Sequence, residues 1–202
     1  MAEIKLTNQE IDAAVEVLQS GALRQGKVCA EFEKQFANKV GAKYALTCSS
    51  GTAALHLAYM SCLKPGDEVI VPAFTFIATA SMVTMVGATP IFCDVDPNTW
   101  VIDLKDAEQR ITKKTKAIAP VHIFGNSCPV DDIKIFAKKH NIYIIWDAAQ
   151  AHGTIYKGED IGKLDNFVCY SFYPSKNMFT GEGGMVTTNN SNFEEKIRFS
   201  RD

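Results

Sequence analysis

The first forty residues carry apolar positions at helical spacing. Thr7 is a suitable N-cap with Glu10 three residues later, and it predicts a helix that runs to about Ser20. A second helix is predicted over residues 30–40, where apolar side chains recur on one face and a glycine follows. Residues 1–41 are therefore expected to form N-terminal helices that precede the main body of the fold.

From residue 44 onward, short apolar runs rich in β-forming residues alternate with helical segments. The predicted strands are Tyr44–Cys48, Glu68–Pro72, Pro90–Val95, Lys116–Ile123, Tyr143–Asp147, Phe167–Phe172 and Met185–Thr188. The predicted helices are Thr52–Cys62, Ile77–Val86, Val130–His140 and Ser191–Arg201. This alternation is typical of βαβ units and predicts an α/β fold.

The strand runs are continuously apolar, which is typical of a parallel sheet covered by helices on both faces. We therefore expect three α/β/α layers around a mostly parallel, mixed sheet of about seven strands. The last run, residues 185–188, follows its predecessor through a loop that need not contain a helix, so this strand could be antiparallel.

Composition narrows the class of protein. The chain has 202 residues, 47% hydrophobic and 22% charged, as in a globular protein with one large or two small domains. A formal net charge of -2 gives no indication of nucleic acid or an anionic membrane as partner. The six cysteines form no CxxC pair, so no metal site is predicted and a reducing compartment is favoured. With neither a signal-peptide pattern nor a membrane-length apolar run, a cytoplasmic location is expected.

Candidate chemistry gathers after the strands, where α/β proteins bind ligands. The hydroxyl-rich turn 49–55 opens a helix, and it either caps that helix or binds a phosphate. Phe76 either packs in the core or stacks on a planar ligand. Asp147 ends an apolar strand and is either a turn residue or the partner of a ligand cation. Lys176 lies on a glycine-rich loop and is either a surface lysine or an imine-forming amine.

Taken together, these features match the needs of pyridoxal 5′-phosphate (PLP). The phosphate requires an anion site, and the ring requires flanking contacts. The pyridine nitrogen requires a carboxylate to stay protonated, and the aldehyde requires a lysine. The sequence provides one candidate for each need, in order along the chain.

Several long stretches also resemble one known family. They are SSGTAALHLA (49–58), PGDEVIVPAFTFIATA (65–80), GATPIFCDVD (87–96), TKAIAPVHIFG (115–125), DAAQAHG (147–153) and SFYPSKNMFTGEGGMVTTN (171–189). Together with Gly26 and residues 31–33, they resemble the DegT/DnrJ/EryC1/StrS family of PLP-dependent sugar aminotransferases, which has the aspartate aminotransferase fold.

The resemblance implies a role for each candidate. Lys176 would hold PLP as a Schiff base and shuttle a proton, and Asp147 would pair with the pyridinium nitrogen. The other implied cofactor contacts are Gln150 near the 3′ oxygen, Phe76 on the ring face, and Gly51, Thr52 and Ser171 at the phosphate.

The resemblance also implies a function and a domain organisation. The expected reaction moves an amino group from L-glutamate or L-glutamine to a nucleotide-linked keto-sugar, in amino-sugar and cell-surface polysaccharide biosynthesis. Family members are about twice as long and are expected to be homodimers. Residues 1–202 would then be the PLP-binding large domain, with the C-terminal small domain absent and the activity of this chain in doubt.

Other interpretations stay open at this stage. The chain could be a PLP-binding regulatory protein or an inactive fragment without transaminase activity. It could also be a lyase of the same fold that acts on cysteine or serine, or a nucleotide-binding α/β domain without PLP. His122 and His152 each follow an apolar run near the candidate site and are either structural or catalytic.

Overall fold

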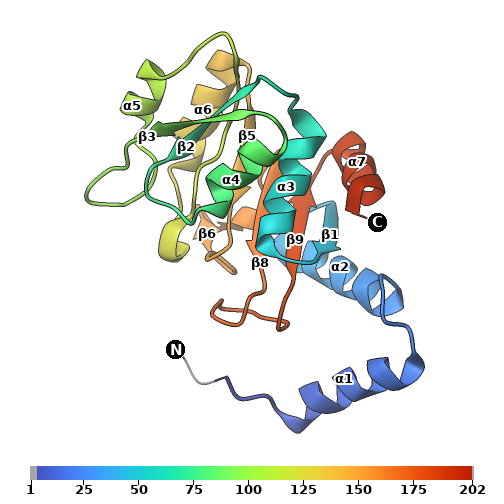
Figure 1. Cartoon of the computed structure of the whole chain (residues 1–202). Coiled ribbons are helices and arrows are strands. Elements are labelled where there is room, and N and C mark those ends of the chain that lie inside the picture. The colour runs from blue at the N-terminus through green and yellow to red at the C-terminus, as the bar shows by residue number, and fades with distance from the viewer. Residues whose placement is uncertain (1–3, 202) are drawn as a thin grey trace.

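A computed structural model describes residues 4–201 and confirms the three-layer α/β architecture (Figure 1). The seven strands of the main sheet lie in the order β1-β9-β8-β5-β4-β2-β3. Their bounds are β1 Tyr44–Cys48, β2 Glu68–Pro72, β3 Thr89–Cys93, β4 Thr115–Ile118, β5 Tyr143–Asp147, β8 Phe167–Ser171 and β9 Gly184–Thr188. Only β9 runs antiparallel to its neighbours, β1 and β8; the other pairs are parallel.

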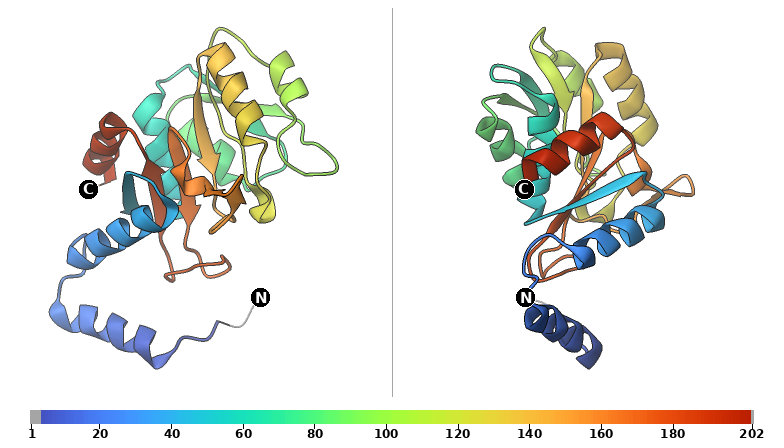
Figure 2. Two further views of the ribbon diagram at one scale, coloured as in Figure 1. Left: turned by 180° about the vertical axis from the view of Figure 1, so that it is seen from behind. Right: turned by 90° about the vertical axis from the view of Figure 1, so that its right-hand side faces the viewer.

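Helices cover both faces of this sheet (Figure 2). Their bounds are α1 Asn8–Ser20, α2 Lys27–Val40, α3 Gly51–Cys62, α4 Ala78–Met85, α5 Leu104–Gln109, α6 Val130–His140 and α7 Ser191–Arg201. Helices α3, α4 and α7 contribute to one apolar cluster, and α2, α5 and α6 contribute to the other. Successive strand residues alternate between the two clusters: Ile144 and Trp146 belong to one and Ile145 to the other.

Helix α1 stands apart from this core (Figures 1 and 2). It contributes no buried residue, although its start is well formed: the Glu10 carboxylate accepts hydrogen bonds from the Thr7 backbone N–H at 2.7 Å and hydroxyl at 2.8 Å. Its apolar side chains, including Leu18 at 65% exposure, are exposed.

Strand β4 is shorter than the apolar pattern predicts. It ends at Ile118, and the chain passes Pro120, which has no N–H to donate to a neighbouring strand. A 3-10 turn, Ile123–Gly125, follows in place of the predicted strand end. Helix α5 and the two-stranded hairpin β6 Ile155–Tyr156 and β7 Glu159–Asp160 were not predicted, because each is too short to show periodicity.

Residues 4–201 contain no candidate for a membrane-spanning helix or for a metal site. None of their helices combines the length and the hydropathy that a membrane crossing requires. No group of three or more histidine, cysteine, aspartate or glutamate side chains is arranged to hold a metal ion in that part of the chain.

Candidate functional site

A pocket of about 680 Å³ opens at the carboxyl edge of the sheet. The sheet register explains why the elements meet there: Cys48 at the end of β1 and Ser171 at the end of β8 both pair with Gly184, the first residue of β9. The structure brings together all seven residues singled out in the sequence: Gly51, Thr52, Phe76, Asp147, Gln150, Ser171 and Lys176.

Asp147 is the last residue of β5 and is 4% exposed. Its Oδ2 accepts a hydrogen bond from the Thr79 hydroxyl at 2.7 Å, and its Oδ1 accepts one from the Ala149 N–H at 3.0 Å. Burial raises the pKa of the Asp147 carboxyl, while these two hydrogen bonds and the positive charge of Lys176 oppose that rise. Since both hydrogen bonds come from neutral groups, a ligand cation beside this buried carboxylate would be strongly favoured.

Lys176 lies in the loop between β8 and β9 and is half-buried. Its N–H donates to the Tyr173 carbonyl at 2.9 Å, which fixes a turn directly after the strand. The loop returns to β9 through Gly181 and Gly183, whose φ values of 84° and 157° favour glycine. Lys176 lines the same pocket as Asp147, and its charge opposes the rise that burial causes in the pKa of that carboxyl.

The N-terminus of α3 also lines this pocket, beside Asp147 and Lys176. Ser50 caps this helix, its Oγ accepting from the Ala53 N–H at 3.1 Å. A Cβ at Gly51 would lie 2.6 Å from the Ser171 Cβ, so only glycine allows the helix to approach β8 this closely. The first N–H groups of the helix, those of Gly51 and Thr52, have no partner within the helix and are suited to an anion.

Two further side chains border the pocket. Phe76 is 69% exposed, which leaves its ring free for a flat ligand. The Gln150 Oε1 accepts a hydrogen bond from the Phe124 N–H at 2.8 Å, and this contact holds the amide at the pocket edge.

Thr75 and Thr79, which were not predicted from the sequence, join the pocket to Asp147. Helical spacing gave no signal for this pair, because Thr75 lies before α4, which begins at Ala78.

The two histidines have different surroundings. His122 is fully buried, stacks on Trp146, and accepts a hydrogen bond from the Cys128 N–H at its Nδ1; burial lowers its pKa to about 3. It does not line the pocket, which indicates a structural role. His152 packs against Tyr170 and Phe172, and its pKa is lowered to about 4 by burial and by the charge of Lys176.

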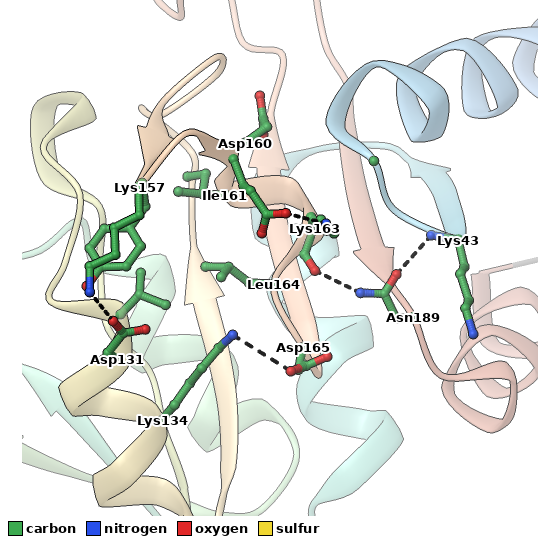
Figure 3. A pocket seen from close by; sticks show the side chains of 14 residues that line it. Lys43, Asp131, Lys134, Lys157, Asp160, Ile161, Lys163, Leu164, Asp165 and Asn189 are labelled. Carbon is green, nitrogen blue, oxygen red and sulfur yellow. Dashed lines mark hydrogen bonds and ion pairs between the residues drawn. The ribbon is translucent and has the colours of Figure 1, made fainter.

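A second hollow of about 600 Å³ lies elsewhere on the molecule (Figure 3). Its charged side chains neutralise one another: Lys157 pairs with Asp131 at 2.5 Å, and Lys134 lies 3.8 Å from Asp165. None of the candidate residues lines it, and its exposed ion pairs leave little net charge to attract a ligand.

The first pocket fits PLP on its own geometry. The buried carboxyl of Asp147 suits a protonated pyridine nitrogen, and the amine of Lys176 suits an aldehyde. The cradle of Gly51 against Ser171, at a helix N-terminus, suits a phosphate.

Comparison with known proteins supports this fit. Residues 5–202 match the DegT/DnrJ/EryC1/StrS aminotransferase family. The chain is 43% identical to GDP-perosamine synthase of Caulobacter vibrioides, over 100% of this chain and 55% of that protein. It is 41% identical to UDP-2-acetamido-2-deoxy-3-oxo-D-glucuronate aminotransferase of Pseudomonas aeruginosa, over 96% of this chain and 57% of that protein.

A solved structure of NtdA from Bacillus subtilis, with bound cofactor PMP (pyridoxamine phosphate), is similar at a TM-score of 0.87 and 34% identity. The match covers 95% of this chain and 45% of that one. This chain thus spans about half the length of the relatives it matches. The family match and the site geometry agree: the chain belongs to the DegT/DnrJ/EryC1/StrS aminotransferase family, whose cofactor is PLP.

Proposed function

We propose that residues 1–202 are the PLP-binding domain of a sugar aminotransferase. The observation that carries this proposal is the convergence of Lys176, Asp147 and the α3 N-terminus on one pocket. By this proposal, residues 1–41 are the N-terminal helices of that domain, and the working protein is a cytoplasmic homodimer.

Each candidate residue has a proposed task. Lys176 supplies the amine that attaches the cofactor, and its Nζ then takes and returns the proton that leaves the Cα of the amino donor. When bound, PLP supplies the electron sink for that proton transfer. Asp147 keeps a proton on the ring nitrogen, and Phe76 and Gln150 hold the ring in place. Gly51, Thr52 and Ser171 bind the phosphate.

The proposed substrates follow from the chemistry that the relatives' names describe. GDP-perosamine synthase and the UDP-linked 3-oxo-glucuronate aminotransferase both point to nucleotide-linked sugars. We infer that the acceptor is a nucleotide-linked keto-sugar and that the donor is L-glutamate or L-glutamine. The product would enter amino-sugar and polysaccharide biosynthesis.

A second candidate function is PLP binding without transamination. The match to the named aminotransferases covers 55% and 57% of their length, so it does not by itself carry their activity to these residues. Both candidates require the same cofactor pocket, and they differ in whether glutamate converts the bound cofactor to its amine form.

Absorption spectroscopy of the purified chain tests the proposal. We expect visible absorption of a PLP Schiff base in the wild type and in Lys138→Ala, a matched control at an exposed lysine of α6. Lys176→Ala should lack that absorption. Adding L-glutamate should then bleach the wild-type band if the chain transaminates, and should leave it unchanged if the chain only binds PLP. A Schiff-base band that persists in Lys176→Ala would contradict the assignment of this lysine.

A further inference from the structure

Two threonine hydroxyls link the pocket to the buried carboxylate of Asp147. The Thr75 Oγ1 lies 2.8 Å from the Thr79 Oγ1, which in turn lies 2.7 Å from the Asp147 Oδ2. Thr75 lines the pocket and is half-buried, whereas Thr79 is fully buried. The two hydroxyls thus form a short chain that ends on one carboxylate oxygen.

Thr79 is held in place from two sides. Its N–H donates to the Phe76 carbonyl at 3.1 Å, at the start of α4. Its own carbonyl accepts a hydrogen bond at 2.8 Å from the hydroxyl of Tyr59, a fully buried residue of α3. These bonds fix the backbone of Thr79, and its fully buried side chain lies against Asp147.

The protons available on these groups determine which hydroxyl donates and which accepts. An ionised carboxylate only accepts hydrogen bonds, so Thr79 must give its single hydroxyl proton to Asp147. The Thr79 oxygen is then free to accept, and the Thr75 hydroxyl must donate to it. This order is strongest while the Oδ2 of Asp147 carries no proton, and it stabilises the ionised carboxylate against its burial.

We propose that Thr79 is a positioning residue for Asp147, oriented by Thr75, and that its hydroxyl keeps this carboxylate ionised and aimed at the ring nitrogen of the cofactor. The inference rests on the proposed function for its ligand, but the Thr79–Asp147 hydrogen bond can be tested without cofactor. Nothing in the reaction itself requires Thr79 to contact substrate.

The other titratable groups near Asp147 do not compete for this role. Burial raises the pKa of each neighbouring thiol and phenol, so these groups stay neutral at ordinary pH, and His122 stays neutral because its pKa is about 3. The groups are Tyr59 on α3, Cys169 on β8, Cys128 before α6 and His122 after β4. Lys176 is the cation of the set, and it acts in the same direction as Thr79.

Thr79→Val removes the hydroxyl at nearly constant shape, and Thr79→Ser retains it. The cofactor-free test is an NMR titration of ¹³C-labelled aspartate, with Asp147 assigned by its loss in Asp147→Asn. Thr79→Val should raise the pKa of Asp147, and Thr79→Ser should restore it. Thr84→Val is the matched control, because the Thr84 hydroxyl, on the same helix, donates to the Ser81 carbonyl. An unchanged Asp147 titration in Thr79→Val would overturn the inference.

The ligand test compares PLP with 1-deaza-PLP, which lacks the ring nitrogen. Thr79→Val should weaken PLP binding about tenfold to hundredfold, the range expected for a hydrogen bond to a charged group, and should leave the affinity for 1-deaza-PLP unchanged. Equal weakening of both ligands would mean that Thr79 only supports the fold, and the inference would fail.

Two outcomes keep the inference separate from the proposed function. If the wild type binds neither ligand, the proposed function fails, and the aspartate titration still decides the role of Thr79. If Thr79→Val does not fold, Thr75→Val replaces it, because that variant keeps the Thr79–Asp147 bond and removes only the donor to Thr79. It should shift Asp147 in the same direction by a smaller amount, and no shift would overturn the inference.

Discussion

Adding a single methyl group at Gly51 should lower both the stability of the fold and the affinity for PLP, and a second substitution should recover only the stability. In Gly51→Ala, the new Cβ would lie 2.6 Å from the Ser171 Cβ and 3.1 Å from its Oγ. Carbon atoms in contact normally lie about 3.5–4.0 Å apart, so α3 or β8 must move by roughly 1 Å. Forcing extra volume into a packed site costs about 1–3 kcal/mol.

Urea unfolding measures the stability part of this prediction. For a chain of this size, about 1–3 kcal/mol corresponds to a fall in Tm of very roughly 2–12 °C. The double variant Gly51→Ala/Ser171→Gly removes the clashing Cβ, leaves the next contact at 3.1 Å from the Ser171 Cα, and should recover most of the loss. PLP binding should not recover with it, because the Ser171 hydroxyl is absent.

The different responses of stability and PLP affinity test this prediction. A Gly51→Ala protein with wild-type stability and wild-type PLP affinity would show that α3 does not approach β8 closely in solution. Recovery of PLP affinity in the double variant would show that the Ser171 hydroxyl does not contribute to the phosphate site.

Three other predictions use the same measurements. Asp147→Asn should weaken PLP binding by roughly 30-fold or more, as expected for loss of one partner of a buried charge pair, yet leave the cofactor-free protein at least as stable, because burial disfavours the charge; a less stable variant would contradict this. Burial lowers the pKa of His122 to about 3, so as the pH falls the imidazole takes up a proton in the unfolded chain before it does so in the folded chain. The contribution of His122 to the free energy of unfolding is therefore fully present above pH 6.5 and falls by about 1.4 kcal/mol per pH unit toward pH 3. Urea unfolding of His122→Gln between pH 7 and pH 5 should lack this component, and an equal pH slope in the variant would refute it. Phe167→Ala, at a side chain with no exposure that packs on Phe193, should cost about 3–5 kcal/mol in urea unfolding, and a loss below 1 kcal/mol would mean that the site collapses.

The apolar pattern was sufficient for the sheet and most helices, because each long element carries its own periodicity. The pattern failed where an element is short and where a proline interrupts an apolar run. Helix α5 has six residues and buries only Ala107, so it offers no repeating face. The end of β4 was overestimated because the continuous ladder ends at Ile118; beyond Pro120, which has no N–H to donate, only an isolated bridge between Val121 and Asp147 continues the pairing among the described residues.

The sequence predicted that the candidate residues at the strand ends form one site, but it did not predict the hydrogen bonds that hold Asp147 there. Asp147 and Thr79 are 68 residues apart, and a buried threonine in an apolar helix looks the same in sequence whether it bonds a carboxylate or its own backbone. Hydrophobic periodicity indicates which side chains are buried, and it carries no information on which polar atoms meet.

The direction of β9 shows most clearly what the third dimension adds. The sequence left that strand's direction open, and the site depends on it. Because β9 is antiparallel, it starts at the edge where β1 and β8 end, and Gly184 pairs with both Cys48 and Ser171. A Cβ at Gly184 would lie 2.2 Å from the Ser50 carbonyl oxygen, so the α3 N-terminus rests directly on this backbone. With β9 reversed, its Thr188 end would occupy this edge, and the loop that carries Lys176 would have to cross the sheet before reaching β9. The antiparallel strand therefore holds the N-terminus of α3 and the lysine loop beside Asp147 in one pocket.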